Sequence, residues 1–373
     1  MAAVGVTPDD REPERGTDPV SGALPSTVHR PFGVPVSVLD VAPVPSGSTP
    51  GDALRASVHL AKLAEDLGYA RFWVAEHHNM PGIASSAPAV LLAHVASATE
   101  RIRVGSGGVM LPNHAPLVVA EQFGMLDALH PGRIDLGIGR APGTDQVTAY
   151  ALRRSVEALS ANDFPQHLLE LMGFFSGDFP DDHPFRNLRA TPGRGQKPDI
   201  WLLGSSDFSA RLAGALGLPF SFAHHFSAPA TLPAVAAYRR EFRPSARLTE
   251  PHLMLAVNVI CAETDAEANR LAASQELAFL LIRTGRPAPL PSPEEAAAYP
   301  YTAADLAQIQ ARRVDQFVGT PGSVRARLEK LLAETGADEL MVSTMVHDPE
   351  ARRRSHELLA KELGMSPLEA AVD

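Results

Sequence analysis

Cysteine is almost absent from this sequence, and long apolar runs are missing as well. Cys261 is the one cysteine in 373 residues, so no disulfide can form within the chain. That usage suits a reducing compartment, and we expect a cytoplasmic protein. Even the apolar stretch Ser86–Ala98 is interrupted by Pro88 and His94, so we expect no membrane-spanning helix. The first thirty residues lack the basic-then-apolar order of a secretory signal.

Positive charge is in deficit. The 33 Lys and Arg residues face 43 Asp and Glu residues, which leaves a net charge of −10. A chain of this charge does not concentrate enough cations to hold a nucleic-acid backbone, so we expect no nucleic-acid partner. The apolar fraction of 45% is that of a globular protein, and the length allows one large domain or two ordinary ones.

The chain divides into a leader and one repetitive region. Residues 1–30 have no hydrophobic periodicity, and we predict a disordered leader. Over residues 31–373 short apolar runs alternate with amphipathic stretches, which we interpret as a single domain. The predicted strands are Val34–Asp40, Arg71–His77, Ile102–Leu111, Arg133–Gly139, Asp199–Gly204, Phe220–His224, Leu253–Cys261 and Glu339–Val346. Eight strands separated by helices favour a closed (β/α)8 TIM barrel of the α/β class over an open doubly wound sheet.

Helical periodicity fills the intervals between these strands, with two exceptions. The segments near residues 162–198 and 285–318 are rich in proline and too long for ordinary connections. Long loops in a barrel often carry function, so we interpret both as insertions, and as candidate lids over the active face.

Polar and titratable residues follow five successive predicted strands. They are Glu76–Asn79, Gly105–His114, Gly137–Gly143, Gly204–Asp207 and His224–His225. Because the carboxyl ends of barrel strands build the active site, we expect these clusters to meet there. Ordinary polar loops would explain one such cluster, whereas five together favour a site.

Several familiar catalytic signatures are missing. Gly137–Gly143 reads G-x-G-x-x-x-G, with Pro142 where a helix should open, so it is not a nicotinamide-binding fingerprint. No P-loop, G-x-S-x-G or H-E-x-x-H pattern occurs, and we expect no metal. Neighbouring strand residues point to opposite faces, so one histidine of each His-His pair can face the barrel interior. His77 or His224 in that position would suit an acid–base or oxyanion-stabilising role.

A phosphate-binding site is one interpretation of Gly204–Ser209. Hydroxyl groups at a strand-to-helix junction, beside free backbone N–H groups, can hold an anion. An ordinary helix cap explains the same pattern, and Asp207 would have to point away from a phosphate. Arg140 could donate to an anion, or it could be a solvated residue of a rim turn.

Four collinear motifs resemble the bacterial luciferase-like flavin monooxygenases, and the closer likeness is to a non-luminous branch. The motifs are Trp73–His78, Val104–Pro112, Asp127–Arg133 and Val318–Pro321. The resemblance runs from Val34 to about Leu363, omits the leader and weakens across both insertions. The family fold is a (β/α)8 barrel. The resemblance implies that FMN in its reduced form, FMNH2, reacts with O2 to give a flavin hydroperoxide that oxygenates a small organic substrate.

The resemblance also implies roles for individual residues. His77 matches the catalytic histidine of the family, and His224 is a weaker candidate for substrate contact. Gly107 and Gly108 match a non-prolyl cis peptide under the flavin ring. The remaining matches lie near the flavin or its phosphate, and they are Arg140, Arg153 (with Arg154 as a rival), Ser205, Ser206 and Ser209.

Two departures from luciferase concern the fourth strand. Gly139 replaces a reactive cysteine and Gly143 replaces a nearby aromatic residue, changes that we expect to open the pocket. They argue against light emission and against long-chain aldehyde specificity.

These features favour a two-component monooxygenase that receives FMNH2 from a separate NAD(P)H:flavin reductase, since no nicotinamide site is visible. Family members are commonly dimers, so we expect a homodimer. Two alternatives stay open: a deazaflavin-dependent reductase that transfers hydride, and a flavin-binding protein without catalysis.

Overall fold

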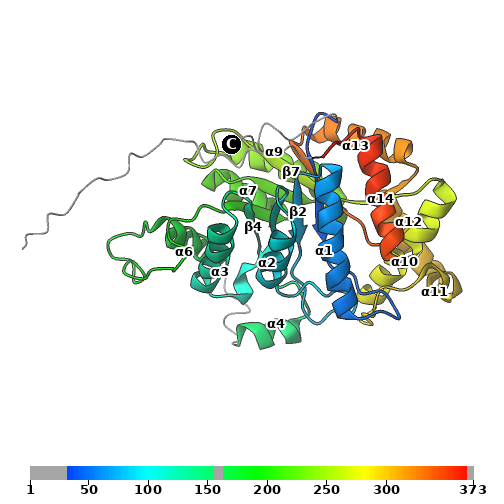
Figure 1. The fold of residues 1–373 in the computed structure, drawn as a ribbon, viewed down its shortest axis with the longest axis horizontal. Coiled ribbons are helices and arrows are strands. Elements are labelled where there is room, and N and C mark those ends of the chain that lie inside the picture. The colour runs from blue at the N-terminus through cyan, green and yellow to red at the C-terminus, as the bar shows by residue number, and fades with distance from the viewer. Residues whose placement is uncertain (1–31, 155–162, 368–373) are drawn as a thin grey trace, which may run out of the picture.

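Eight parallel strands close into a barrel in the computed structural model, which describes residues 32–154 and 163–367 (Figure 1). The predicted leader over residues 1–30 lies outside the described residues. In order around the barrel the strands are β1 (Val36–Asp40), β2 (Arg71–Val74), β3 (Arg103–Met110), β4 (Ile134–Gly139), β5 (Asp199–Gly204), β6 (Phe220–Ala223), β7 (Leu253–Cys261) and β9 (Glu339–Ser343). Strand β9 pairs with both β7 and β1, which closes the circle. The predicted TIM barrel is confirmed.

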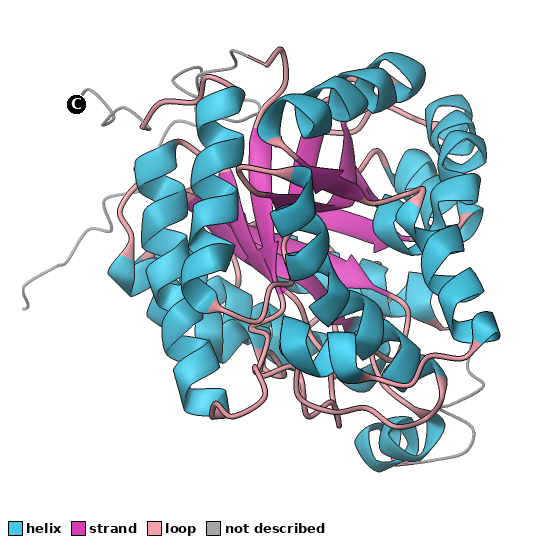
Figure 2. Ribbon diagram, turned by 90° about the vertical axis from the view of Figure 1, so that its right-hand side faces the viewer, coloured by secondary structure: helices cyan, strands magenta, loops and turns pink. Residues whose placement is uncertain are grey.

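Helices surround the strands on the outside (Figure 2). The helices that follow barrel strands are α1 (Pro50–Leu67), α2 (Pro88–Ala98), α3 (Pro116–Leu129), α4 (Gln146–Arg153), α6 (Phe164–Ser176), α7 (Asp207–Leu216), α8 (His224–Ser227), α9 (Thr231–Glu241), α10 (Asp265–Arg283), α13 (Pro321–Thr335) and α14 (Pro349–Glu362). Many have proline in the first turn, where its missing N–H has no intrahelical partner to lose. Among the described helices, none is long and apolar enough to cross a membrane.

The observed strands differ from the predicted ones at several boundaries and by one additional short strand. The apolar run of β6 ends at Ala223, and helix α8 begins at His224, so the strand does not extend to that histidine. A short strand, β8 (Phe317–Gly319), was not predicted, and it pairs with the carboxyl half of β7 outside the circle of eight. Three residues are too few for a periodic signal in the sequence.

The segment near residues 162–198 is not a lid over the active face. Its helix α6 buries Phe164, Leu168 and Leu171 in the layer between barrel and helices. The loop that follows returns along α3, where the Lys197 amide donates to Asp127 at 2.9 Å, and it leads into the amino end of β5. A helix that restores the usual strand–helix alternation explains the length of this segment.

The segment near residues 285–318 lies at the carboxyl ends of the barrel strands. It holds α11 (Pro293–Ala298), α12 (Ala303–Arg313) and the first residues of β8. The Leu290 amide donates to the Val44 carbonyl, and the Ser46 amide donates to the Leu290 carbonyl, both at 2.8 Å. These contacts fasten the segment to the loop after β1, at the carboxyl ends of the strands. Its movement as a lid stays a prediction.

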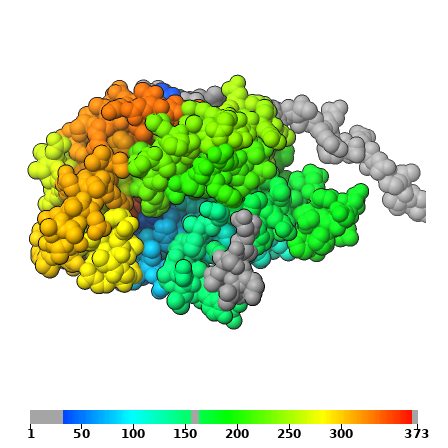
Figure 3. Space-filling view, turned by 180° about the vertical axis from the view of Figure 1, so that it is seen from behind, coloured from blue at the N-terminus to red at the C-terminus, as the bar shows by residue number. Residues whose placement is uncertain are grey.

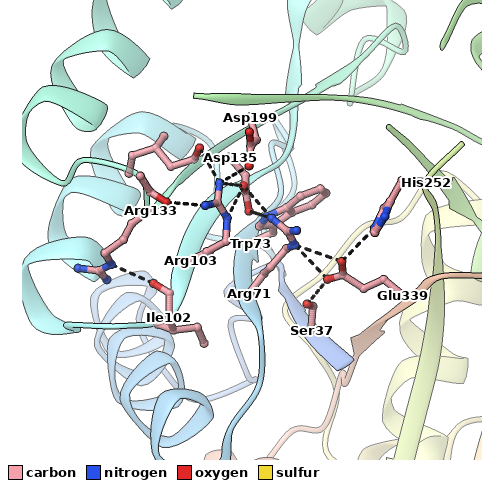
Figure 4. A network of polar contacts seen from close by, with 12 residues as sticks. Ser37, Arg71, Trp73, Ile102, Arg103, Arg133, Asp135, Asp199, His252 and Glu339 are labelled. Carbon is pink, nitrogen blue, oxygen red and sulfur yellow. Dashed lines mark hydrogen bonds and ion pairs between the residues drawn. The ribbon is translucent and has the colours of Figure 1, made fainter. Parts of the chain in front are cut away.

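Buried charges fill the amino end of the barrel interior (Figure 4). Arg71 donates to both carboxylate oxygens of Asp135 at 2.9 Å and to Glu339 at 3.1 Å. Arg103 donates to Asp135 and to Asp199 at 2.6 Å each. Burial would raise the pKa of Asp135, but Arg103 and Arg71 together hold it below its usual range. The network ties β2, β3, β4, β5 and β9 together.

An apolar layer lies above these charges. Trp73 and Trp201 are fully buried and meet edge to face, with ring centroids 5.4 Å apart. Leu39, Met254 and Met341 complete the same interior cluster. The lower and middle parts of the barrel are therefore filled, and a ligand can enter from the carboxyl end alone.

Replacing Asp135 with asparagine should destabilise the fold strongly. The variant Asp135→Asn leaves Arg71 and Arg103 with one buried carboxylate fewer, which we expect to lower the free energy of unfolding by about 3–5 kcal/mol. Urea denaturation followed by circular dichroism measures the change. Asp199→Asn is the matched control, because Asp199 bonds Arg103 alone and keeps some solvent contact; its cost should be clearly smaller. Equal losses in both variants would contradict this reading of the network.

Candidate active site

A cavity opens above the apolar layer, at the carboxyl ends of the strands. Its unfilled space, counted out to the solvent at its mouth, is about 920 Å³. Leu39, Trp73, Leu203, Ala256 and Met341 form apolar walls. On the face drawn in Figure 3 the surface is hollowed between the green segment around residues 200–240 and the yellow and orange segments around residues 270–320.

The wall at β3 is backbone without side chains. The Gly107–Gly108 peptide bond is cis, as predicted, and both glycines line the cavity. A Cβ on Gly107 would lie 2.6 Å from Leu39 Cδ1, and one on Gly108 would lie 2.7 Å from the Gly137 carbonyl oxygen. No side chain fits at either position without displacing its neighbours, so the sequence keeps a flat surface there.

His77 lies where it was predicted, in the wall that follows β2. Its Nδ1 is 2.6 Å from the carbonyl oxygen of Glu76. A carbonyl accepts and never donates, so Nδ1 carries the proton and Nε2 is left with a lone pair. Burial lowers the pKa of His77 to about 4, although the nearby Glu76 carboxylate acts against the shift. A neutral imidazole of this form can accept a proton at Nε2.

His224 does not line the cavity, and its prediction as a substrate contact does not hold. Its Nδ1 is 2.8 Å from the Thr231 hydroxyl, and its ring faces Phe317 of β8. The neighbouring His225 lines the cavity instead. Ser221 and Ala223 of β6 line the cavity, and in the helical turn of α8 that follows the strand, His225 is the histidine that continues this lining.

A cation and three serines occupy the side of the cavity formed by β4 and β5. Arg140, Ser205, Ser206 and Ser209 all line it. The guanidinium of Arg140 lies over the Phe208 ring at 4.2 Å. Ser206 precedes α7 without a capping hydrogen bond from its own side chain, so the amides of the first turn stay available to an anion.

Asp207 does not disturb this anion site. Its carboxylate accepts a hydrogen bond from Arg211 at 3.2 Å, one turn along α7 and in solvent. The pair holds the negative charge on the outer surface of the helix, which resolves the conflict seen in the sequence.

Arg153 is not brought to the cavity. Its Nε donates to the Asn113 side chain at 3.1 Å, and the Asn113 amide in turn donates to the Pro142 carbonyl at 2.9 Å. In this arrangement Arg153 is linked through Asn113 to the loop after β4. The predicted direct contact of Arg153 with a phosphate is not supported by its position.

Glu76 has a role in the site that we did not predict. Its buried carboxylate accepts hydrogen bonds from His78 at 2.9 Å, from His114 at 2.8 Å and from the Met110 amide at 3.1 Å. Burial would raise the pKa of Glu76, but these donors lower it overall. The carboxylate therefore ties the loop that carries His77 to the loop that follows the glycine wall. Two of the donors, the Met110 amide and the His114 ring, are 34 and 38 residues away from Glu76 in the sequence. No local sequence pattern reveals contacts of this range.

The expected opening at Gly139 and Gly143 is taken up by Met110. A Cβ on Gly139 would lie 3.0 Å from the Met110 sulfur, and one on Gly143 would lie 3.1 Å from its Cγ. Met110 itself lines the cavity. The flexible thioether of Met110 from β3 therefore occupies space beside Gly139 of β4 and Gly143 of the loop after it, and the pocket is reshaped more than enlarged.

These residues define what the site can do. It offers a flat backbone surface at Gly107–Gly108, apolar walls, a neutral histidine base, and an anion cradle formed by Arg140, Ser205, Ser206 and Ser209. Together these features suit a flat ligand that carries a phosphate. Among the described residues, no group of three or more His, Cys, Asp or Glu side chains is placed to hold a metal ion.

The family model described as luciferase-like monooxygenase matches residues 34–339. The Bacillus subtilis protein YvbT is 49% identical over 87% of this chain and 95% of its own length. A luciferase-like monooxygenase of Escherichia coli K12 is 46% identical over 86% and 95%. The N-acetyl-S-alkylcysteine monooxygenase of B. subtilis is 37% identical over 87% and 97%.

Solved structures share the fold. Apo-MsnO8 has a TM-score of 0.82 at 41% identity and covers 90% of this chain and 99% of its own. The oxygenating constituent of 3,6-diketocamphane monooxygenase from Pseudomonas putida, a type II Baeyer–Villiger monooxygenase in complex with FMN, has a TM-score of 0.65 at 20% identity, over 90% and 99%. An F420-dependent secondary alcohol dehydrogenase has the same TM-score at 15% identity, over 88% and 99%. The chain belongs to the luciferase-like monooxygenase family.

Proposed function

We propose that this chain is a two-component monooxygenase, which takes FMNH2 from a separate NAD(P)H:flavin reductase and oxygenates a small organic substrate. The observation that carries the proposal is one cavity in which the glycine wall Gly107–Gly108 and the anion cradle around Arg140 occur together. A flavin mononucleotide has the matching parts, a flat ring and a terminal phosphate. Bound in the reduced form, it would supply the electrons that activate O2.

The residues of the chain would bind and shield this cofactor. Arg140 and the serines Ser205, Ser206 and Ser209 would hold its phosphate. The apolar walls would exclude water from the reacting ring. His77 would accept and return a proton at Nε2. The FMN complex of the P. putida enzyme supports FMN, whereas the F420-dependent relative makes a deazaflavin the alternative to test.

Thioethers are the first substrate class that we propose to test. The relative from B. subtilis is named an N-acetyl-S-alkylcysteine monooxygenase, and an S-alkylcysteine contains a thioether. The apolar walls of the cavity suit such a group next to an apolar body. We therefore use 2-(benzylthio)ethanol as a simple probe.

Oxygenation should require an added reductase. The purified protein with FMN and NADH alone should show no NADH oxidation above that of the mixture without protein. After addition of an unrelated NADH:FMN reductase, O2 uptake should yield the sulfoxide of the probe, measured by chromatography. His77→Ala should retain FMN but lower product formation at least tenfold. Hydride transfer from reduced F420 without O2 uptake would instead support the deazaflavin alternative.

If the anion cradle holds the phosphate, a substitution in it should weaken the binding of FMN and not that of riboflavin. Removal of one charge-assisted contact to phosphate in Arg140→Ala should weaken FMN binding about tenfold. Riboflavin has the same ring and no phosphate, so its dissociation constant should change little. Fluorescence titration with both ligands measures the difference. An equal loss for riboflavin and FMN would show that Arg140 acts elsewhere.

We also propose a homodimer in which α2 and α3 form the interface. Helices α2 and α3 lie side by side (Figure 1), and α3 exposes Val118, Met125 and Leu129 along one stripe. Val90 on α2 is 72% exposed. Exposed apolar side chains on neighbouring helices are typical of association surfaces.

A charge placed in this stripe should separate the subunits. Wild-type protein should sediment at twice the chain mass of 39.7 kDa, and Met125→Glu should shift it toward the monomer. Leu306→Glu, at an equally exposed position on α12, is the control and should leave the mass unchanged. Analytical ultracentrifugation makes the comparison, and a dimer that survives Met125→Glu would place the interface elsewhere.

A further inference from the structure

His77 and His225 lie on opposite sides of the cavity. The eight strands follow the order β1, β2, β3, β4, β5, β6, β7, β9, so β2 and β6 are four strands apart in either direction. His77 follows β2, His225 follows β6, and both line the cavity. A ligand at the barrel axis therefore lies between two imidazoles.

Both imidazoles have the same hydrogen-bonding form. Nδ1 of His225 is 2.9 Å from the Ala256 carbonyl oxygen of β7, as Nδ1 of His77 is 2.6 Å from that of Glu76. Each Nδ1 must donate, so each Nε2 carries a lone pair. Burial lowers the pKa of His225 to about 4, although the bond to Ala256 acts against the shift, so the ring is neutral near pH 7.

Nε2 of His225 is available to a ligand. Among the described residues it has no hydrogen-bond partner, and it is not one of the buried unpaired atoms. The surroundings are otherwise apolar or weakly polar: Ala223 and Ala256 beside it, Ser221 deeper in the wall, and the Phe226 ring 4.1 Å from its own. Phe226 is largely exposed, so this part of the cavity lies toward the mouth.

The charges of the site lie away from Nε2 of His225. Among the described residues that line the cavity, Arg140 is the charged one, and it belongs to the phosphate side. Arg312 of α12 packs on the Phe279 ring at 3.9 Å outside the cavity, near enough to disfavour a proton on His225. A ligand at His225 thus meets an uncharged acceptor.

We propose that His225 determines substrate specificity, and that its Nε2 accepts a hydrogen bond from an N–H or O–H group of an otherwise apolar, uncharged substrate. The proposal rests on the proposed function. A substrate without a donor group would leave Nε2 desolvated and without a hydrogen bond, which costs binding free energy. A substrate with a donor would form that hydrogen bond, so the site favours it.

A matched pair of probes tests this selection by equilibrium binding. 2-(Benzylthio)ethanol carries an O–H donor, and its methyl ether has the same body without the donor. Dissociation constants are measured by ligand-observed NMR on the protein saturated with oxidised FMN, so the measurement does not depend on turnover. Wild-type protein should prefer the alcohol about tenfold, which corresponds to one net hydrogen bond.

Three variants distinguish His225 from its surroundings. His225→Leu should lose the preference, and His225→Gln, which keeps an acceptor oxygen, should retain part of it. His224→Gln changes the adjacent histidine, which lies outside the cavity, and should keep the full preference. FMN affinity should stay within twofold in all three. The 15N shifts of the His225 ring should report the neutral, Nδ1-protonated form between pH 6 and 8.

Several results would overturn the proposal. They are equal binding of the two probes to wild-type protein, no binding of either probe, or a titrating imidazolium at position 225 between pH 6 and 8. A fall in FMN affinity in His225→Leu with the preference intact would assign Nε2 to the cofactor. Failure of the proposed function is seen separately, as absent FMN binding or absent reductase-dependent oxygenation in wild-type protein.

Discussion

The guanidinium of Arg71 holds carboxylates from opposite sides of the barrel, Asp135 of β4 and Glu339 of β9, and this contact limits what the rest of the interior can do. Buried charges are stable only when each is paired with its partner. These paired side chains fill the amino end of the barrel, and no room for a ligand remains there. Trp73 links this layer to the site, because its indole N–H donates to Asp135 at 2.8 Å while its ring lines the cavity. The charge cluster therefore determines the depth at which the cavity begins.

Above that depth, the shape of the cavity depends on how closely β3 and β4 approach each other. A Cβ on Gly137 would lie 2.1 Å from the Ser106 carbonyl oxygen, so glycine is required for the two strands to pair at this spacing. The same closeness leaves Gly107 and Gly108 as a bare wall and lets Met110 pack against Gly139. Removal of side chains from two neighbouring strands thus creates a flat slot, whose remaining walls are supplied by larger residues such as Leu203 from β5.

Hydrophobic periodicity located all eight barrel strands, because each is a short apolar run that packs on both faces. The site was predicted less completely. His77, Arg140 and the serines follow strands directly and lie in the cavity, whereas the positions of Arg153 and Glu76 depend on partners about 35 to 40 residues away. His225 also lies in the cavity, but it belongs to the helical turn α8 after β6, so the alternation of the strand does not indicate its position.

The distribution of charge along the cavity gives a ligand one orientation. Arg140 presents a cation where an anion can also meet the first turn of α7, whereas His77 and His225 are neutral near pH 7 because burial lowers both pKa values to about 4. An anionic group is therefore stabilised at the β4–β5 side and gains nothing from the histidines, which can only accept hydrogen bonds there. A phosphate-bearing flavin would thus be held by its charged end, and the space between the two imidazoles would remain for an uncharged molecule that brings its own donor.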